Sequence, residues 1–252
     1  MIRKPGLTNK KTAPAVVKVK RNQASRPAEA NGQDGMVTNI AKLADVAYGQ
    51  IEEAIVTLHI PPGTSVSELT LSKATGIGRT PIREAIQRLA RENLILVLPQ
   101  RGLLVPLIDV SKQLRLLETR RELERLVCRS AAKRSTPEQK KAFTRLAKEF
   151  TTAGAANDDK TFIRSDREFN ELCLVAAHNE FSEGAMRLMH GLSRRFWYYH
   201  YKQAADLPEI SRLHAAVARA IGNGDVAAAA TACDRLMDNI EAFTRSTVMS
   251  NI

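Results

Sequence analysis

The sequence predicts a mostly α-helical protein, with a winged helix-turn-helix unit at residues 37–107 and an antiparallel all-helical bundle at residues 108–246. Three observations predict this fold class. Short segments before residue 93 have helical apolar periodicity, two strand-like apolar runs follow within residues 94–105, and the pattern is helical from residue 109 onward. A basic tail, residues 1–36, precedes both units.

The first of these observations rests mainly on one short amphipathic segment, residues 78–89. Its apolar face follows the helical i, i+3, i+4, i+7 spacing and consists of Ile82, Ala85, Ile86 and Leu89. Its opposite face carries Thr80, Arg83, Glu84, Gln87 and Arg91. Pro81 suits a first helical turn, so we expect a helix over residues 80–92 with Thr80 as its N-cap. A helix that buries one side and offers arginines near its N-terminus is typical of major-groove recognition, so the segment predicts DNA binding.

The flanking segments complete the winged helix-turn-helix prediction. A first helix is expected at residues 40–58, with its apolar face formed by Leu43, Ala47, Ile51, Ile55 and Leu58. A two-turn helix at 67–75 would meet the recognition segment at a glycine turn. The apolar runs 94–98 and 103–105 predict a β-hairpin, the wing, with Arg101 and Gly102 at its tip. The alternative is a small α/β module whose arginines only solvate a surface.

Three stretches of this unit resemble the GntR family of bacterial transcription regulators: residues 60–63, 78–89 and 99–102. The resemblance implies that Arg79 and Arg83 approach bases and phosphates and that Gly102 enters the minor groove. The candidate DNA-binding residues are Arg79, Thr80, Arg83, Gln87, Arg101 and Gly102. The family usually has serine where Gly78 stands, a departure that removes one expected phosphate or cap contact.

The overall charge agrees with this prediction. The 252 residues carry a formal net charge of +11, and residues 1–106 contribute +7 of it, from 15 basic and 8 acidic residues. Residues 1–36 hold eight of these basic residues and no periodic apolar pattern, which predicts a disordered tail or an electrostatic arm for DNA. The three separated cysteines form no metal-binding spacing, and no run of eighteen apolar residues occurs. We therefore expect a reduced, cytoplasmic protein without a membrane partner.

Six helices are expected in the second half of the chain. They are placed at residues 110–134, 137–154, 158–177, 180–203, 207–222 and 225–246. The order of winged helix, short linker and helical bundle resembles the GntR branch with an FCD-type ligand-sensing domain, which contains the fatty-acid-responsive regulator. The motifs that carry this resemblance are Thr119–Glu124, Asp166–Asn170, and His214 followed by 220–225.

Four of these helices place an ionisable residue in the middle of an apolar stripe. The residues are Arg120, Asp166 with Asn170 on its flank, Arg195, and His214. Burying one such group unpaired costs several kcal/mol, so four that converge predict a shared polar cavity. The alternative for each one alone is a satisfied core residue or a salt bridge. Guanidinium groups grip carboxylates with two parallel hydrogen bonds, so we expect a small organic acid as effector.

In this interpretation Arg120 is the principal anchor, assisted by Arg195 or His214, and Asp166 holds His214 or pairs with Arg120. Relatives often hold a divalent metal at this place, and the resemblance matches Asp166 and His214 to two of their four ligands. Asn170 and Leu236 stand at the other two positions, so we expect no metal and no other cofactor. His178, His190 and His200 match no ligand position and are expected in loops or on the surface.

The sequence therefore predicts a homodimeric, ligand-responsive regulator that reads a pseudo-palindromic double-stranded DNA operator, most simply as a repressor. One alternative is a regulator that senses a metal or a redox state with the same bundle, through relocated histidines or cysteines. A more distant alternative is an enzyme that uses Asp166 and His214 as an acid–base pair, although no nucleophile elbow or phosphate loop accompanies them.

Overall fold

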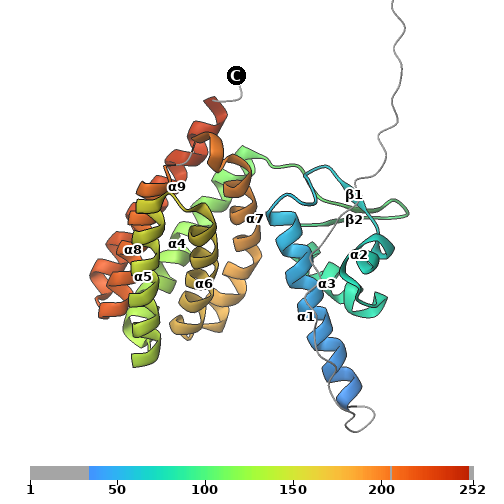
Figure 1. Cartoon of the computed structure of the whole chain (residues 1–252), viewed down its shortest axis with the longest axis horizontal. Coiled ribbons are helices and arrows are strands. Elements are labelled where there is room, and N and C mark those ends of the chain that lie inside the picture. The colour runs from blue at the N-terminus through green and yellow to red at the C-terminus, as the bar shows by residue number, and fades with distance from the viewer. Residues whose placement is uncertain (1–33, 205, 250–252) are drawn as a thin grey trace, which may run out of the picture.

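The computed structural model describes residues 34–204 and 206–249 and places them in two units that lie side by side (Figure 1). The N-terminal unit contains α1 (Asp34–Val56), β1 (Ser65–Val66), α2 (Glu68–Thr75), α3 (Arg79–Arg91), β2 (Leu96–Leu98) and β3 (Gly102–Leu104). The bundle contains α4 (Val110–Arg134), α5 (Pro137–Ala156), α6 (Asp159–Ala177), α7 (Glu180–Ala204), α8 (Leu207–Asn223) and α9 (Val226–Met249). The predicted fold class is confirmed.

The apolar face of α3 forms the centre of the N-terminal core. Ile82, Ala85 and Leu89 are fully buried, and Ile86 is nearly so, as the periodicity predicts. They pack with Ile51 and the other apolar residues of α1. The first helix differs from its expected bounds, since it begins at Asp34 and ends at Val56. Its first turns extend beyond the packed unit (Figure 1), which explains why Leu43 is 39% exposed rather than part of the core.

The start of α3 corrects the cap expected from the sequence. Gly78 is the N-cap, with extended backbone and no side-chain cap, so Thr80 lies inside the first turn. The reason is the turn before it: Gly76 ends α2 in the left-handed conformation with φ 73°, and Ile77 is buried. Burial of Ile77 fixes the chain so that the helix starts at Arg79, one residue after Gly78.

The wing is a three-stranded antiparallel sheet with the order β1-β3-β2. Leu98 pairs with Gly102 at the hairpin end, which confirms the predicted hairpin. Strand β2 is shorter than the predicted run, because Leu94 and Ile95 are buried in the core and close the end of α3 through hydrogen bonds to Leu89. Strand β3 has the predicted length but lies one residue earlier. The two-residue strand β1 is too short to produce a sequence pattern.

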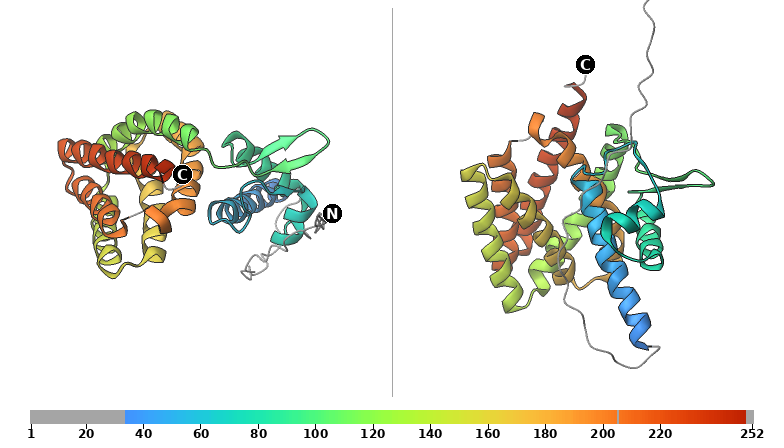
Figure 2. Two further views of the ribbon diagram at one scale, coloured as in Figure 1. Left: turned by 90° about the horizontal axis from the view of Figure 1, so that it is seen from above. Right: turned by 45° about the vertical axis from the view of Figure 1, so that its right-hand side comes forward.

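The six bundle helices surround a second apolar core (Figure 2). Their ends lie within three residues of the predicted ends, and Asp109, Thr136, Asp158 and Asp206 cap the N-termini of α4, α5, α6 and α8. No helix among the described residues is long and apolar enough to cross a membrane. The predicted disordered tail lies outside the described residues, apart from positions 34–36, which begin α1.

Candidate functional site

The solvent-facing side of α3 presents the candidate DNA-binding side chains. Arg79, Thr80, Arg83 and Gln87 are all exposed, opposite the buried face. Arg83 donates from Nε to Glu68 Oε2 of α2 over 2.8 Å, and its side chain is still 63% exposed. The helix therefore offers its polar face to a partner without rearrangement of the core.

Arg88 of α3 has a different environment. Arg88 pairs with Asp45 of α1, and its guanidinium lies 4.1 Å from the centre of the Tyr48 ring. Tyr48 in turn donates its hydroxyl to Glu92 Oε2 over 2.8 Å. Burial and the neighbouring Glu92 carboxylate raise the pKa of Tyr48, so the hydroxyl stays a donor. These contacts tie the C-terminal half of α3 to α1.

The wing tip carries the last two candidates, Arg101 and Gly102, both exposed. Gly102 has φ 88°, and a Cβ atom there would lie 3.2 Å from the Val66 carbonyl oxygen. The backbone therefore requires glycine at this position, independently of any contact between the wing and DNA.

A cavity of about 60 Å³ lies among α4, α6, α7, α8 and α9 and reaches the end of α1. Its apolar wall includes Val56, Phe162, Phe196, Trp197 and Phe243. Its polar wall includes Arg120, Asp166, Asn170, His190, Arg194 and His214. The volume suffices for a few water molecules or one small polar ligand. Four of the five predicted effector-binding residues are therefore brought together.

Asp166 and His214 are in direct contact in this cavity. His214 Nε2 lies 3.2 Å from Asp166 Oδ1, and His214 Nδ1 lies 2.8 Å from the Ile210 carbonyl oxygen. Asn170 donates from Nδ2 to the same Asp166 oxygen over 3.1 Å. Burial alone would raise the pKa of Asp166, but the His214 hydrogen bond and the charges of His214, Arg194 and Arg120 hold it below its usual value. Asp166 thus holds His214, the first of the two roles that the sequence left open.

Arg120 and His190 form a second polar group on the cavity wall. Arg120 donates from Nε to Glu124 Oε1 over 2.9 Å, one turn along α4. The sequence placed His190 on the surface, but its Nε2 is buried and lies 3.9 Å from the same oxygen. Among the residues that the structure describes, this atom has no hydrogen-bond partner. Burial lowers the pKa of His190 to about 4, so its imidazole is neutral. The Nε2 atom of this neutral imidazole is therefore available to a ligand.

Two further sequence expectations concerning α7 are wrong. Arg195 does not line the cavity; it lies against the linker, where Nη1 donates to the Pro106 carbonyl over 3.3 Å. Its Nε is buried without a hydrogen-bond partner in the described part of the chain. The neighbouring Arg194 lines the cavity in its place. The angular position assigned to a residue on a helical wheel becomes less accurate along a helix of this length. The i, i+4, i+7 spacing of His190, Arg194 and Trp197 is a signal that could have identified Arg194. His200 is also buried, against Phe196, whereas His178 is exposed as expected.

Comparisons with known proteins agree with both units. Residues 43–105 match the model of bacterial regulatory proteins of the gntR family, and residues 115–239 match the FCD domain. The chain is a DNA-binding transcriptional regulator of the GntR/FCD type. It is 28% identical over 135 residues to an HTH-type transcriptional regulator of Agrobacterium vitis, covering 52% of this chain and 78% of that one.

Other relatives match shorter parts. The regulator is 26% identical over 125 residues to the Nta operon transcriptional regulator of Aminobacter aminovorans, which covers 50% of this chain and 59% of that protein. It is 36% identical over 92 residues to the Escherichia coli repressor RspR, covering 36% and 40% of the two chains. The solved structure of E. coli McbR/YncC has a TM-score of 0.71 at 19% identity and covers 82% of this chain and 98% of that one. This last likeness supports the fold.

The residues of this regulator do not fit the metal site that the family resemblance implies. Asp166 and His214 are present, but Asn170 turns its amide nitrogen toward Asp166, and Leu236 is 7% exposed and packed in the core. Within residues 34–204 and 206–249, no three histidine, cysteine or acidic side chains are grouped so as to hold a metal ion. Asp166 and His214 contact each other, and two ligands are too few to hold a transition metal.

The three cysteines, distant in the sequence, meet in the bundle core. Cys128 of α4 interacts with both Cys173 of α6 and Cys233 of α9, and each is at most 3% exposed. Hydrogen bonding with Cys173 and burial raise the pKa of Cys128, and burial raises the pKa of Cys173. Thiols that are buried and protonated react slowly with oxidants. This environment is that of structural cysteines.

Proposed function

We propose that this regulator is a homodimeric, cytoplasmic repressor that binds a small organic acid in the bundle cavity and a pseudo-palindromic duplex operator with α3. The observation that carries the effector assignment is the composition of the cavity wall. Two guanidinium groups, Arg120 and Arg194, and the unpartnered His190 line one small, largely apolar space. Hydrogen-bond donors grouped in an apolar pocket select a carboxylate over a neutral or cationic ligand.

The DNA-binding half of the proposal rests on the exposed face of α3. Arg79, Arg83 and Gln87 would contact the edges of bases or phosphates in the major groove, while Arg101 at the wing tip would follow the backbone. In a symmetric dimer this places two half-sites about one helical turn apart. Repression agrees with the role of the E. coli relative RspR, which is a transcriptional repressor.

Two rival functions predict different results. A metal-sensing regulator would lose thermal stability with a chelator, and a redox-sensing one would lose operator affinity with hydrogen peroxide. The incomplete ligand set around Asp166 and the buried, protonated thiols favour neither. An enzyme would need a reacting group beside Asp166 and His214, and the cavity wall offers no serine or cysteine nucleophile hydrogen-bonded to that histidine.

The test is a thermal-shift panel of small carboxylates and sugar acids on the purified full chain, each with and without a chelator. We expect one class of acid to raise the melting temperature, independently of the chelator, because a ligand that binds only the native state stabilises it. A melting temperature that falls with chelator alone would replace this proposal by metal sensing. No stabilisation by any acid would refute the effector assignment.

A further inference from the structure

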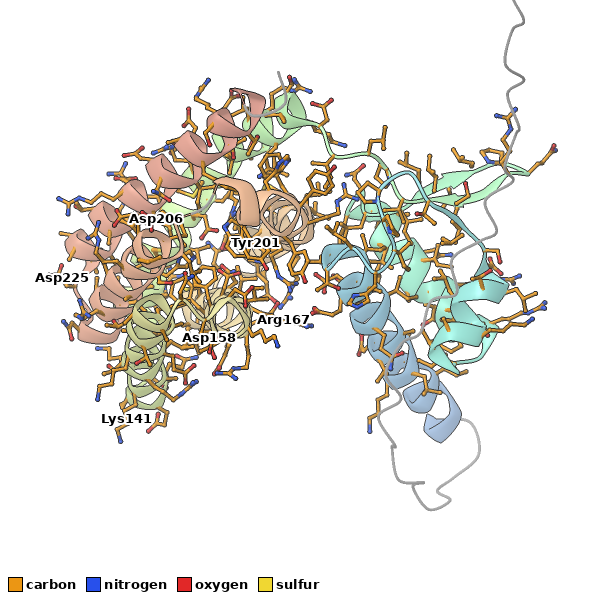
Figure 3. The ribbon with its side chains drawn as sticks, turned by 45° about the horizontal axis from the view of Figure 1, so that its top comes forward. Lys141, Asp158, Arg167, Tyr201, Asp206 and Asp225 are labelled. Carbon is orange, nitrogen blue, oxygen red and sulfur yellow. The ribbon has the colours of Figure 1, made fainter. Side chains whose placement is uncertain are left out.

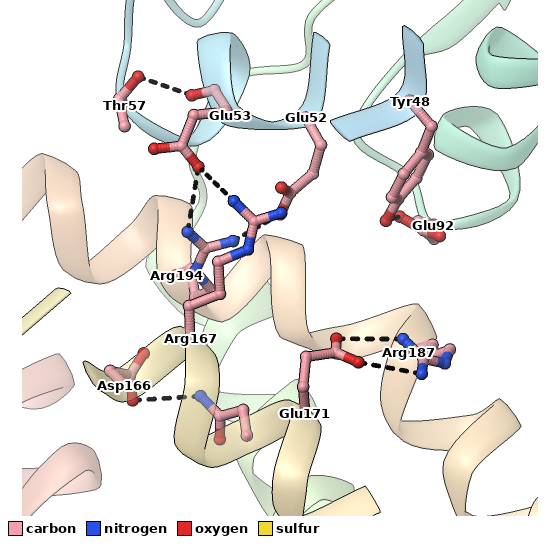
Figure 4. A network of polar contacts seen from close by, with 11 residues as sticks. Tyr48, Glu52, Glu53, Thr57, Glu92, Asp166, Arg167, Glu171, Arg187 and Arg194 are labelled. Atoms are coloured by element: carbon pink, nitrogen blue, oxygen red, sulfur yellow. Dashed lines mark hydrogen bonds and ion pairs between the residues drawn. The ribbon is translucent and has the colours of Figure 1, made fainter. Parts of the chain in front are cut away.

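Arg194 belongs to the effector cavity and to the boundary between the two units at the same time. It lines the cavity from α7, and its Nη1 donates to Glu52 Oε1 of α1 over 2.7 Å (Figure 4). Its Nη2 lies 3.4 Å from Glu53 Oε2, which also accepts from Arg167 of α6 over 3.2 Å. Figure 3 shows Arg167 on the side of the bundle nearest α1. Two arginines of the bundle thus hold two adjacent glutamates of the DNA-binding unit.

The central pair of this contact is shielded from water. The side chains of Arg194 and Glu52 are only 13% and 7% exposed. Burial alone would lower the pKa of Arg194, but the charges of Glu52, Asp166 and Glu53 keep it above its usual value. In such an environment a charge is stable only with a partner, so the release of Glu52 from Arg194 requires another anion in its place.

The glutamates lie on the helix that supports α3. Val56, at the end of α1, lines the cavity itself. Further along α1, Tyr48 and Asp45 hold the C-terminal half of α3 through Glu92 and Arg88. A displacement of Glu52 therefore moves a helix that packs directly against the recognition helix.

We propose that Arg194 couples the cavity to DNA binding, because a carboxylate bound in the cavity competes with Glu52 and Glu53 for its guanidinium. This inference rests on the proposed acid effector. Arg194 is then a positioning residue: it changes the contact between α7 and α1, and with it the orientation of α3. Asp166 lines the same cavity, and the positive charge of Arg194 lowers its pKa.

The other cavity arginine provides the contrast. Arg120 is paired with Glu124 of its own helix, and both side chains are 11% exposed. A ligand that displaces Glu124 breaks a pair within α4 rather than a contact between the two units. Arg120 would therefore contribute to the affinity for the acid, whereas Arg194 would transmit the effect of the bound acid to α1.

The experiment replaces the two glutamates and leaves the cavity wall intact. Operator DNA is selected from a random duplex pool with the wild-type full chain, and formate, acetate, lactate and malonate are the probe acids. For wild type we expect the stabilising acid to change operator affinity about fivefold or more. In Glu52→Gln/Glu53→Gln, we expect the acid still to raise the melting temperature but to leave operator affinity unchanged. The matched control is Arg187→Gln, on the same helix but paired with Glu171 and Glu183 within the bundle, which keeps the wild-type response.

A double variant that keeps the wild-type operator response would overturn the coupling role, even if the acid binds. If no acid changes stability or operator affinity of the wild type, the effector assignment fails, and the coupling is then judged without ligand. In that case Arg194→Gln and Glu52→Gln/Glu53→Gln should each shift operator affinity about fivefold, and their combination no further. Additive shifts, or affinities equal to that of Arg187→Gln, would refute it.

Discussion

The two arginine-bearing regions of this regulator differ in how firmly their charges are held. Arg83 on α3 is 63% exposed and paired with one surface carboxylate, a contact that contributes at most about 1 kcal/mol. Arg194 in the bundle is 13% exposed and shares its guanidinium between two glutamates of α1. The first can leave Glu68 for a phosphate at little cost, whereas the second can leave Glu52 only for another anion. The recognition surface is thus exposed for DNA, whereas Arg194 is held in a shielded ion-pair network between the two units.

The largest expected effect is on the open region. Arg83→Ala should reduce affinity for the specific operator about 100-fold, because an arginine contact in the groove contributes about 1–3 kcal/mol and this residue lies at the centre of the exposed face. Fluorescence anisotropy with labelled operator measures it. Since the side chain is exposed, the melting temperature should not change. Arg212→Ala, an exposed bundle arginine paired with Glu209, is the matched control. Wild-type affinity in Arg83→Ala would contradict the assignment of α3.

The second effect concerns the closed region. Arg120→Ala should retain operator binding and lose the effect of the stabilising acid, measured by anisotropy with and without that acid. The variant also leaves Glu124 buried without a partner, which costs about 3–5 kcal/mol. Arg120→Ala/Glu124→Gln separates the two consequences: we expect its stability to return toward wild type while the acid response stays absent. A restored response would show that Arg120 is only structural.

The third effect is a pH dependence within the cavity. Burial lowers the pKa of His190 to about 4 from its ordinary value of 6.5, so between these values the unfolded chain binds a proton that the folded chain does not. Stability should therefore fall as the pH decreases from 6.5 to 4, with a slope of up to about 1.4 kcal/mol per pH unit. Denaturant melts of wild type and His190→Gln across this range measure it. Equal slopes in both proteins would show that His190 is not the group responsible.

The smallest effect concerns Arg195, whose Nη1 donates to the Pro106 carbonyl. Burial lowers its pKa to about 10, which is the sign of a charge held without an anion. Replacing it by an apolar side chain of similar length removes that cost, so Arg195→Met should raise the melting temperature by about 2–4 °C. Calorimetry of the two proteins decides it. A lower melting temperature would mean that the contact with the linker outweighs the burial of the charge.

The same contrast explains what the sequence could predict. Exposure of Arg79, Arg83 and Gln87 depends on helical phase within a single short helix, which the spacing of Ile82, Ala85 and Leu89 fixes. The cavity depends on how five long helices are rotated against one another. The sequence identifies Arg120, Asp166 and His214 because each interrupts an apolar stripe. It does not identify His190, and it selects Arg195 where the cavity-lining residue is the neighbouring Arg194.

Contacts between distant segments could not be predicted from the sequence. The ion pairs of Glu52 and Glu53 with Arg194 join residues about 140 positions apart, and on a helical wheel these glutamates are ordinary surface charges. The meeting of Cys128, Cys173 and Cys233 likewise depends on the packing of three helices. Neither arrangement leaves a periodic signal in any one segment.

The most direct test of the account is reciprocity between its two regions. The dissociation constant of the stabilising acid is measured by calorimetry with the full chain alone and with the full chain saturated by operator DNA. If the cavity and α3 are coupled, operator must change the affinity for the acid by the same factor by which the acid changes the affinity for operator. Identical affinities for the acid with and without operator would contradict the account.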